Sequence, residues 1–223
     1  MQDAAMDVAT PTRDGRHLVP MGLLLALTAC SPYADAERDV AAGGRGLAKL
    51  NPSPQQSYEL VLTLKDAPGP FAMVEGVAQY DASNYAACGR IVPAMGTAGR
   101  ITSQEPVALR QVGENEYRGM FYLDRMQDED YYGRGVCHWT LTGVGAMLRA
   151  TTGEADTRFL TFVDKERMES DSPLTLYYPN LIYPRADTVA NFGASGKEDP
   201  SGYSEELRDA LFSTTTTVRQ LSP

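Results

Sequence analysis

Short segments in which apolar and polar residues alternate recur along most of the chain beyond residue 57. The first is Tyr58–Leu64 (YELVLTL), which places three leucines on one face and ends at the turn sequence DAPGP. Seven further segments of extended character follow, at 71–80, 107–112, 117–124, 136–142, 145–151, 157–163 and 174–178. Short strands separated by frequent turn residues predict a mainly β fold, an antiparallel β-sandwich.

Helical periodicity is confined to a segment close to the end of the sequence. In Ser204–Phe212 (SEELRDALF), Ser204 is a suitable N-cap, and Leu207, Leu211 and Phe212 share one face. We therefore expect a late helix, at most one or two short helices in the whole fold, and an otherwise irregular C-terminal segment.

The first thirty residues carry an export signal. Arg13, Arg16 and His17 precede the apolar run Leu18–Ala29, which is the order of a secretory signal peptide. As a helix this run extends only ~18 Å, too short for the ~30 Å hydrocarbon core of a bilayer. The pattern predicts a signal peptide over residues 1–29 and not a membrane-spanning helix.

The end of this run, Leu27-Thr28-Ala29-Cys30, resembles the lipobox of bacterial lipoproteins. The resemblance implies cleavage before Cys30 and a lipid on its thiol. The alternative is an ordinary cleavage site that happens to contain a cysteine. Because Ser31, and not aspartate, follows the cysteine, the resemblance implies a periplasmic protein anchored in the outer membrane.

Three segments are expected from these signals. Residues 1–29 are the signal peptide, and residues 30–57 are the lipid anchor and a flexible tether, because Gly43, Gly44, Gly46, Pro52 and Pro54 interrupt any periodicity there. Residues 58–223 are the β-sandwich domain, with the irregular C-terminal segment at its end.

Charge and composition exclude several classes of function. With 20 basic and 29 acidic residues, the 223-residue chain has a net charge of -9, which repels nucleic acid. Three cysteines and two histidines are too few for zinc-ribbon, haem or iron–sulfur sites. We expect neither a nucleic-acid partner nor a metal or other cofactor.

Cys88 and Cys137 remain as a pair once Cys30 is assigned to the lipid. In an oxidising periplasm such a pair is expected to form a disulfide, which would stabilise the fold by about 4 kcal/mol in the chain-entropy model. Two separately buried thiols are the alternative.

No catalytic motif is complete in the sequence. The run Gly193–Lys197 (GASGK) matches neither a serine-hydrolase elbow nor a phosphate-binding loop. His138 is the one imidazole beyond the signal peptide, and it precedes Trp139 in an expected strand without a nucleophile motif nearby. We therefore expect a protein that is not an enzyme.

The densest polar cluster is an acidic and aromatic run, which also predicts the contact surface. It comprises Asp124, Asp128, Glu129, Asp130, Tyr131 and Tyr132. Carboxylates steer basic partners, and tyrosines bury area at a small entropic cost, so these residues are candidates for binding a protein. Three alternatives stay open: a solvated acidic loop, a calcium site, and tyrosines that simply pack in the core.

A family resemblance rests on three stretches. Residues 87–89 (ACG), Tyr117-Arg118-Gly119 with Asp124, and 128–139 (DEDYYGRGVCHW) are similar to small periplasmic lipoproteins found with antibacterial secretion systems, which resemble immunity proteins. The resemblance implies a protein that binds and blocks a secreted toxic effector, often a phospholipase delivered by a type VI secretion system. Other effector classes, and a ligand-binding or structural envelope lipoprotein without a toxin partner, are the alternatives.

Overall fold

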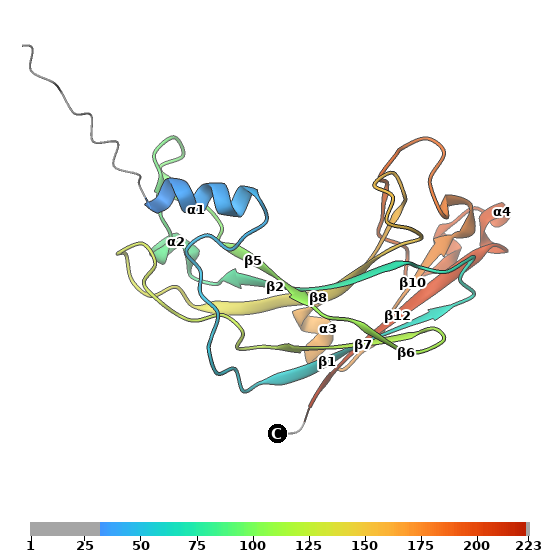
Figure 1. Ribbon diagram of the computed structural model, residues 1–223, viewed down its shortest axis with the longest axis horizontal. Helices are drawn as coiled ribbons and strands as arrows, with labels where there is room; N and C mark the ends of the chain where they lie inside the picture. Colours follow the sequence, from blue (N-terminus) through green and yellow to red (C-terminus); the bar gives the residue numbers. More distant parts are fainter. Residues whose placement is uncertain (1–31, 222–223) are drawn as a thin grey trace, which may run out of the picture. The chain divides into compact units, whose positions relative to one another are not determined.

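The computed structural model describes residues 32–221, which form two five-stranded β-sheets (Figure 1). One sheet has the order β10 (Leu174–Pro179), β12 (Leu211–Gln220), β1 (Ser57–Lys65), β7 (Glu116–Tyr122) and β6 (Arg110–Gly113). The other has the order β11 (Gly193–Ala194), β9 (Arg158–Asp164), β8 (Trp139–Arg149), β2 (Met73–Ala82) and β5 (Thr102–Val107). Neighbouring strands are antiparallel except β11 and β9. The predicted mainly β, antiparallel sandwich is confirmed.

The remaining elements are short. A hairpin pairs β3 (Ile91–Val92) with β4 (Thr97–Ala98). The helices are α1 (Pro32–Ala41), α2 (Tyr85–Cys88), α3 (Lys165–Glu169) and α4 (Glu205–Arg208), with single 3₁₀ turns at Asn180–Ile182 and Pro200–Gly202. The described part of the chain therefore has four short helices where one or two were expected, and none of them is long and apolar enough to cross a membrane.

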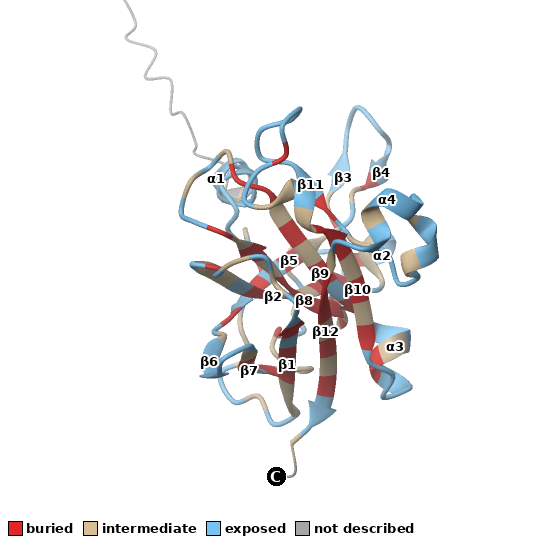
Figure 2. Cartoon of the chain, turned by 90° about the vertical axis from the view of Figure 1, so that its right-hand side faces the viewer, coloured by how far each residue is buried: buried red, intermediate tan, exposed pale blue. Residues whose placement is uncertain are grey.

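The core lies between the facing surfaces of the two sheets. Leu60, Leu62 and Leu64 of β1 are buried, as their alternation predicted, and each stabilises the fold by roughly 2 kcal/mol. An aromatic cluster centres on Phe159 of β9, whose ring lies 5.1 Å from that of Phe212. In Figure 2 the buried positions follow the strands, whereas α3 and α4 are mostly exposed.

One long strand replaces two predicted ones. β8 (Trp139–Arg149) runs unbroken through Gly143 and Gly145, where separate strands at 136–142 and 145–151 are expected from the sequence. A Cβ at Gly145 would lie 2.0 Å from the carbonyl oxygen of Thr161 on β9. Gly145 therefore lies at a point inside β8 where the backbone of β9 comes too close for a side chain. Conversely, the predicted strand at 107–112 is divided between the end of β5 and β6.

The prediction of an irregular C-terminal segment is wrong for residues 211–220. These residues form β12, which pairs with both β1 and β10. Its inward positions include Thr214 and Thr216, so the hydrophobic alternation that identifies a strand is missing from the sequence. The Thr216 hydroxyl is 2.7 Å from that of Thr161 in the facing sheet. The late helix is correspondingly shorter than expected and ends at Arg208.

The segment expected to be a flexible tether is folded from residue 32 onward. It begins with α1, and Leu50 then pairs with Met126 in an isolated β-bridge. The backbone N–H of Asn51 donates to Arg125, and that of Gln127 donates to Lys49, at 2.8 and 2.9 Å. Backbone hydrogen bonds to a loop leave no periodic pattern, which is why the sequence did not reveal them. The signal peptide and Cys30 fall outside the described residues.

The predicted disulfide between Cys88 and Cys137 is confirmed. Both cysteines are buried in a small second cluster with Ala82, apart from the main core. Tyr85, Ile101, Tyr131 and Tyr132 pack against this cluster. The bond therefore joins α2 to the residues that precede β8.

Replacing Phe159 by alanine tests the aromatic core. Phe159 is fully buried, so Phe159→Ala is expected to lower the free energy of unfolding by about 4 kcal/mol. Phe162→Ala is the matched control, because Phe162 lies three residues along the same strand and is 41% exposed. It should cost about 1 kcal/mol or less. Denaturant unfolding followed by circular dichroism measures both, and equal losses would contradict this placement of the core.

Candidate functional site

The six residues predicted to contact a partner lie in one connection between the two sheets. We call residues 124–132 the acidic loop; it follows β7 and precedes β8. The disulfide fixes its far side to α2, and α1 lies at the same end of the sheets, opposite α4 (Figure 1). The predicted contact residues therefore occupy one end of the domain.

Asp124 holds the chain that enters β1. Its two carboxylate oxygens accept hydrogen bonds from the backbone N–H groups of Gln55 and Gln56 at 2.8 and 3.0 Å. Its own carbonyl accepts a third bond from the side-chain amide of Asn51 at 2.9 Å. Asp124 is thus engaged in organising residues 51–56.

Asp128 joins the acidic loop to the start of β8. One carboxylate oxygen accepts from the backbone N–H of Trp139 at 2.9 Å, and the other lies 2.7 Å from Nδ1 of His138. Both side chains of this pair are exposed to solvent. The imidazole is therefore a surface partner of Asp128, and its expected lack of a catalytic role stays a prediction.

Glu129 and Asp130 are also held by contacts within the chain. Glu129 forms an ion pair with Lys49 at 2.6 Å, and its carbonyl accepts from the N–H of Cys137 at 3.0 Å. Asp130 accepts from the N–H of Arg134 at 3.0 Å. Desolvation raises the pKa of Asp130, but backbone N–H groups of residues 132–135 outweigh it and hold the pKa below its ordinary value. Asp130 therefore stays ionised and fixes the turn that follows it.

The two tyrosines differ in their surroundings. The Tyr131 hydroxyl donates to the carbonyl of Gln127, and its ring meets that of Trp139 edge-on at 6.4 Å. Tyr132 stacks on Tyr33 of α1 at 5.9 Å. Burial, followed by the nearby Tyr33, raises the pKa of the Tyr132 hydroxyl. Tyr131 thus packs inward, while Tyr132 connects the acidic loop to α1.

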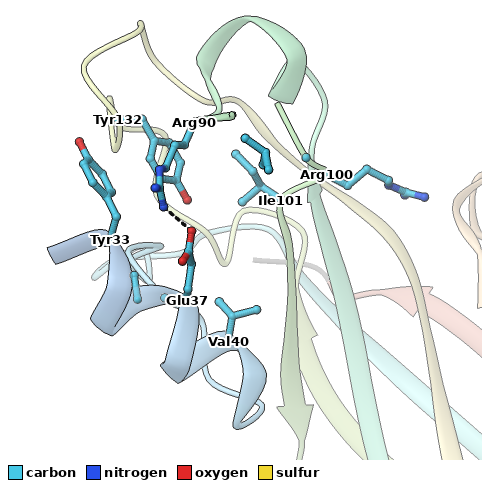
Figure 3. A pocket seen from close by; sticks show the side chains of 11 residues that line it. Tyr33, Glu37, Val40, Arg90, Arg100, Ile101 and Tyr132 are labelled. Atoms are coloured by element: carbon cyan, nitrogen blue, oxygen red, sulfur yellow. Dashed lines mark hydrogen bonds and ion pairs between the residues drawn. The ribbon is translucent and has the colours of Figure 1, made fainter. Parts of the chain in front are cut away.

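A cavity of about 220 Å³ lies between α1 and the disulfide-linked segments (Figure 3). Tyr33, Glu37 and Val40 line it from α1, and they share one face because they lie three or four residues apart. Tyr132 and Ile101 line it from the body. The walls are mainly apolar and open to solvent, with charge confined to a few side chains.

Arg90 closes one side of this cavity. Its guanidinium forms an ion pair with Glu37 and lies 5.2 Å from the ring centroid of Tyr33. Cofactor and drug-sized ligand sites are usually about 300–1,000 Å³, so this volume suits one large apolar side chain better. The spacing of residues 33, 37 and 40 was a signal available in the sequence, whereas nothing there pointed to Arg90 or Ile101.

The chain that follows α1 is tied to β5 by an ion pair whose carboxylate is buried. Arg45 donates to both carboxylate oxygens of Glu105, at 3.0 and 2.8 Å, and Ser103 donates to one of them at 2.8 Å. Burial raises the pKa of Glu105, but the hydrogen bonds from Arg45 and Ser103 outweigh this effect and lower it. This pair fixes Gly46, which also lines the cavity.

No three His, Cys, Asp or Glu side chains within residues 32–221 lie close enough together to hold a metal ion. In the acidic loop, Asp124, Asp128 and Asp130 direct their oxygens to separate backbone N–H groups. These three carboxylates therefore hold the backbone of the loop and of its neighbouring segments in place.

Acid should remove the contribution of Glu105 to stability. Because its pKa is lowered on folding, the ionised carboxylate stabilises the fold above the ordinary value of 4.5, and this contribution is lost as pH falls below it. Glu105→Gln should lower the free energy of unfolding by about 2 kcal/mol at neutral pH. The difference from wild type should shrink in acid.

Urea unfolding across the acidic pH range measures this difference. The control is Glu169→Gln, since Glu169 forms an exposed pair with Lys165 and should change stability by about 0.5 kcal/mol or less. A Glu105→Gln effect that is independent of pH would contradict the assignment.

Comparisons with protein-family models, with curated proteins and with solved structures each gave no match to this chain.

Proposed function

We propose that this chain is a periplasmic lipoprotein, held in the outer membrane by a lipid on Cys30, that binds and neutralises a secreted antibacterial effector. The export signal and the lipobox-like LTAC sequence support its location. The similarity of residues 87–89 and 117–139 to immunity lipoproteins supports the activity. A phospholipase is the effector class which that similarity favours.

The observation that carries the proposal is the rigid construction of one end of the domain. The acidic loop is fixed by the disulfide, by Lys49 and by backbone hydrogen bonds, and it adjoins the cavity beneath α1. A binding surface that is already ordered loses less conformational entropy when a partner docks. Exposed Asp128 and Asp130 supply negative charge beside an apolar cavity, a combination that suits a basic partner with one protruding apolar side chain.

The internal contacts refine the assignment of contact residues. Asp124 and Tyr131 are taken up by structural bonds, so their proposed role is to hold the loop. Asp128, Asp130 and the exposed part of Tyr132 are proposed to meet the effector, with the Lys49–Glu129 pair at the border. No chemistry by this chain is required for inhibition by binding.

A second candidate is the binding of a small apolar ligand. It is favoured by the two tyrosines, Tyr33 and Tyr132, that line the cavity. The cavity volume, about 220 Å³, argues against it, because small-molecule sites are usually larger. A structural envelope role is the remaining alternative. Whether cells that lack this gene survive delivery of the toxin distinguishes the immunity function from both alternatives.

Neutralising the acidic loop should slow association with the effector. The variant Asp128→Asn, Glu129→Gln, Asp130→Asn removes three charges while its amide oxygens still accept the backbone hydrogen bonds. With the secreted effector that this protein neutralises, the association rate should fall about tenfold at low salt and less at high salt. Stopped-flow or surface-based kinetics measures this.

The matched control removes three charges from the opposite end of the domain. Glu205→Gln, Glu206→Gln and Asp209→Asn change exposed residues in and next to α4, and the association rate should stay at the wild-type value. If the two variants slow binding equally, the acidic loop is not the contact surface. If cells that lack this gene survive toxin delivery as well as wild-type cells, the immunity function is wrong.

A further inference from the structure

The hairpin β3–β4 projects an uncharged apolar tip into solvent. Residues 91–97 (IVPAMGT) are all exposed, and none of them carries a charge. Met95 is 65% exposed, Ile91 40% and Val92 36%. Large apolar side chains grouped at a protruding tip are unusual on a soluble surface and indicate contact with another surface.

The base of this hairpin lies beside the first turn of α1. Arg90, which directly precedes β3, contacts both Tyr33 and Glu37 of that helix. α1 begins at Pro32, only two residues after Cys30. Two residues extend at most ~7 Å, so a lipid on Cys30 would keep the start of α1, and the hairpin beside it, close to the bilayer.

We propose that the β3–β4 hairpin is a membrane-contact element that inserts Ile91 and Met95 into the interface of the phospholipid leaflet holding the Cys30 lipid, while Val92 lines the cavity beneath α1. This inference rests on the lipid anchor of the proposed function. Apolar side chains gain free energy by leaving water at the level of the headgroups. Arg90 and Arg100, on either side of the hairpin, pair with Glu37 and Asp81 of the chain itself, so the membrane contact rests on the apolar tip.

The short connection favours a membrane over a protein partner. A flexible tether would allow the domain to turn freely, whereas α1 is attached to the body through Tyr33 and Glu37. The hairpin therefore meets the bilayer whether or not an effector is bound. With the hairpin in the interface, two contacts set the orientation of the domain: the lipid and the tip.

Tryptophan fluorescence in lipid vesicles tests this orientation. The protein carrying Met95→Trp, purified from the membranes of the cells that produce it, is reconstituted into vesicles of phosphatidylethanolamine and phosphatidylglycerol, with and without brominated acyl chains. The emission of the new tryptophan should shift to shorter wavelength and be largely lost in the brominated vesicles. The control is Met120→Trp, because Met120 is 54% exposed on β7, which belongs to the sheet that contains β1 and not to the hairpin. Native Trp139 contributes equally to both samples.

The mass of the N-terminal peptide, measured on the same samples, separates the two hypotheses. Lipid on Cys30 with an unquenched Met95→Trp overturns the hairpin inference and leaves the anchor intact. An unmodified Cys30 with a quenched Met95→Trp supports the hairpin contact and overturns the anchor. Equal quenching at both positions, or a Met95→Trp response only when the toxin is added, also overturns the membrane contact.

Discussion

The bond between Cys88 and Cys137 is the constraint on which the end of the domain with the acidic loop and the cavity depends. The main core lies between the two sheets and includes Met126 of the acidic loop, whereas α2, Ile101 and the two tyrosines of the loop pack on a separate and much smaller cluster. Such a cluster buries too little apolar surface to hold these segments by packing alone. Between β2 and β8 the chain passes through the opposite sheet, and the disulfide links the beginning of this connection to its end. It therefore holds α2 against the residues that precede β8.

The order of the acidic loop follows from this constraint. Once Cys137 is fixed, its backbone N–H meets the carbonyl of Glu129, and Asp128 can cap the start of β8. Carboxylates held in this way keep their positions, which favours rapid recognition by a basic surface. The same feature limits adaptability, so a partner would have to match the loop as it stands. Recognition by shape and charge, without chemistry, is consistent with a protein that acts by occupying its target.

The regular parts of the sandwich were predictable, and the site was predictable only in outline. β1 was predictable because the aliphatic residues Leu60, Leu62 and Leu64 occupy its inward positions. β12 was not predictable, because the polar residues Thr214 and Thr216 occupy inward positions there. The disulfide followed from counting cysteines. The acidic loop was identified, but its internal bonds were not, because a sequence does not show which backbone N–H a carboxylate meets. The folding of residues 32–56 was missed because its apolar signal is sparse: Tyr33, Ala48 and Leu50 pack on the body, and backbone hydrogen bonds and ion pairs fix the rest of the segment.

Hydrogen exchange of the protein with and without the disulfide tests the central claim most directly. In the double variant Cys88→Ser, Cys137→Ser, amides of residues 85–101 and 128–138 should exchange much faster, while those of β1 and β12 in the main core should remain protected. This result would show that the bond organises the end of the domain with the acidic loop and that the core stands without it. Unchanged exchange at residues 128–138, or an equal loss of protection in both sheets, would contradict the account.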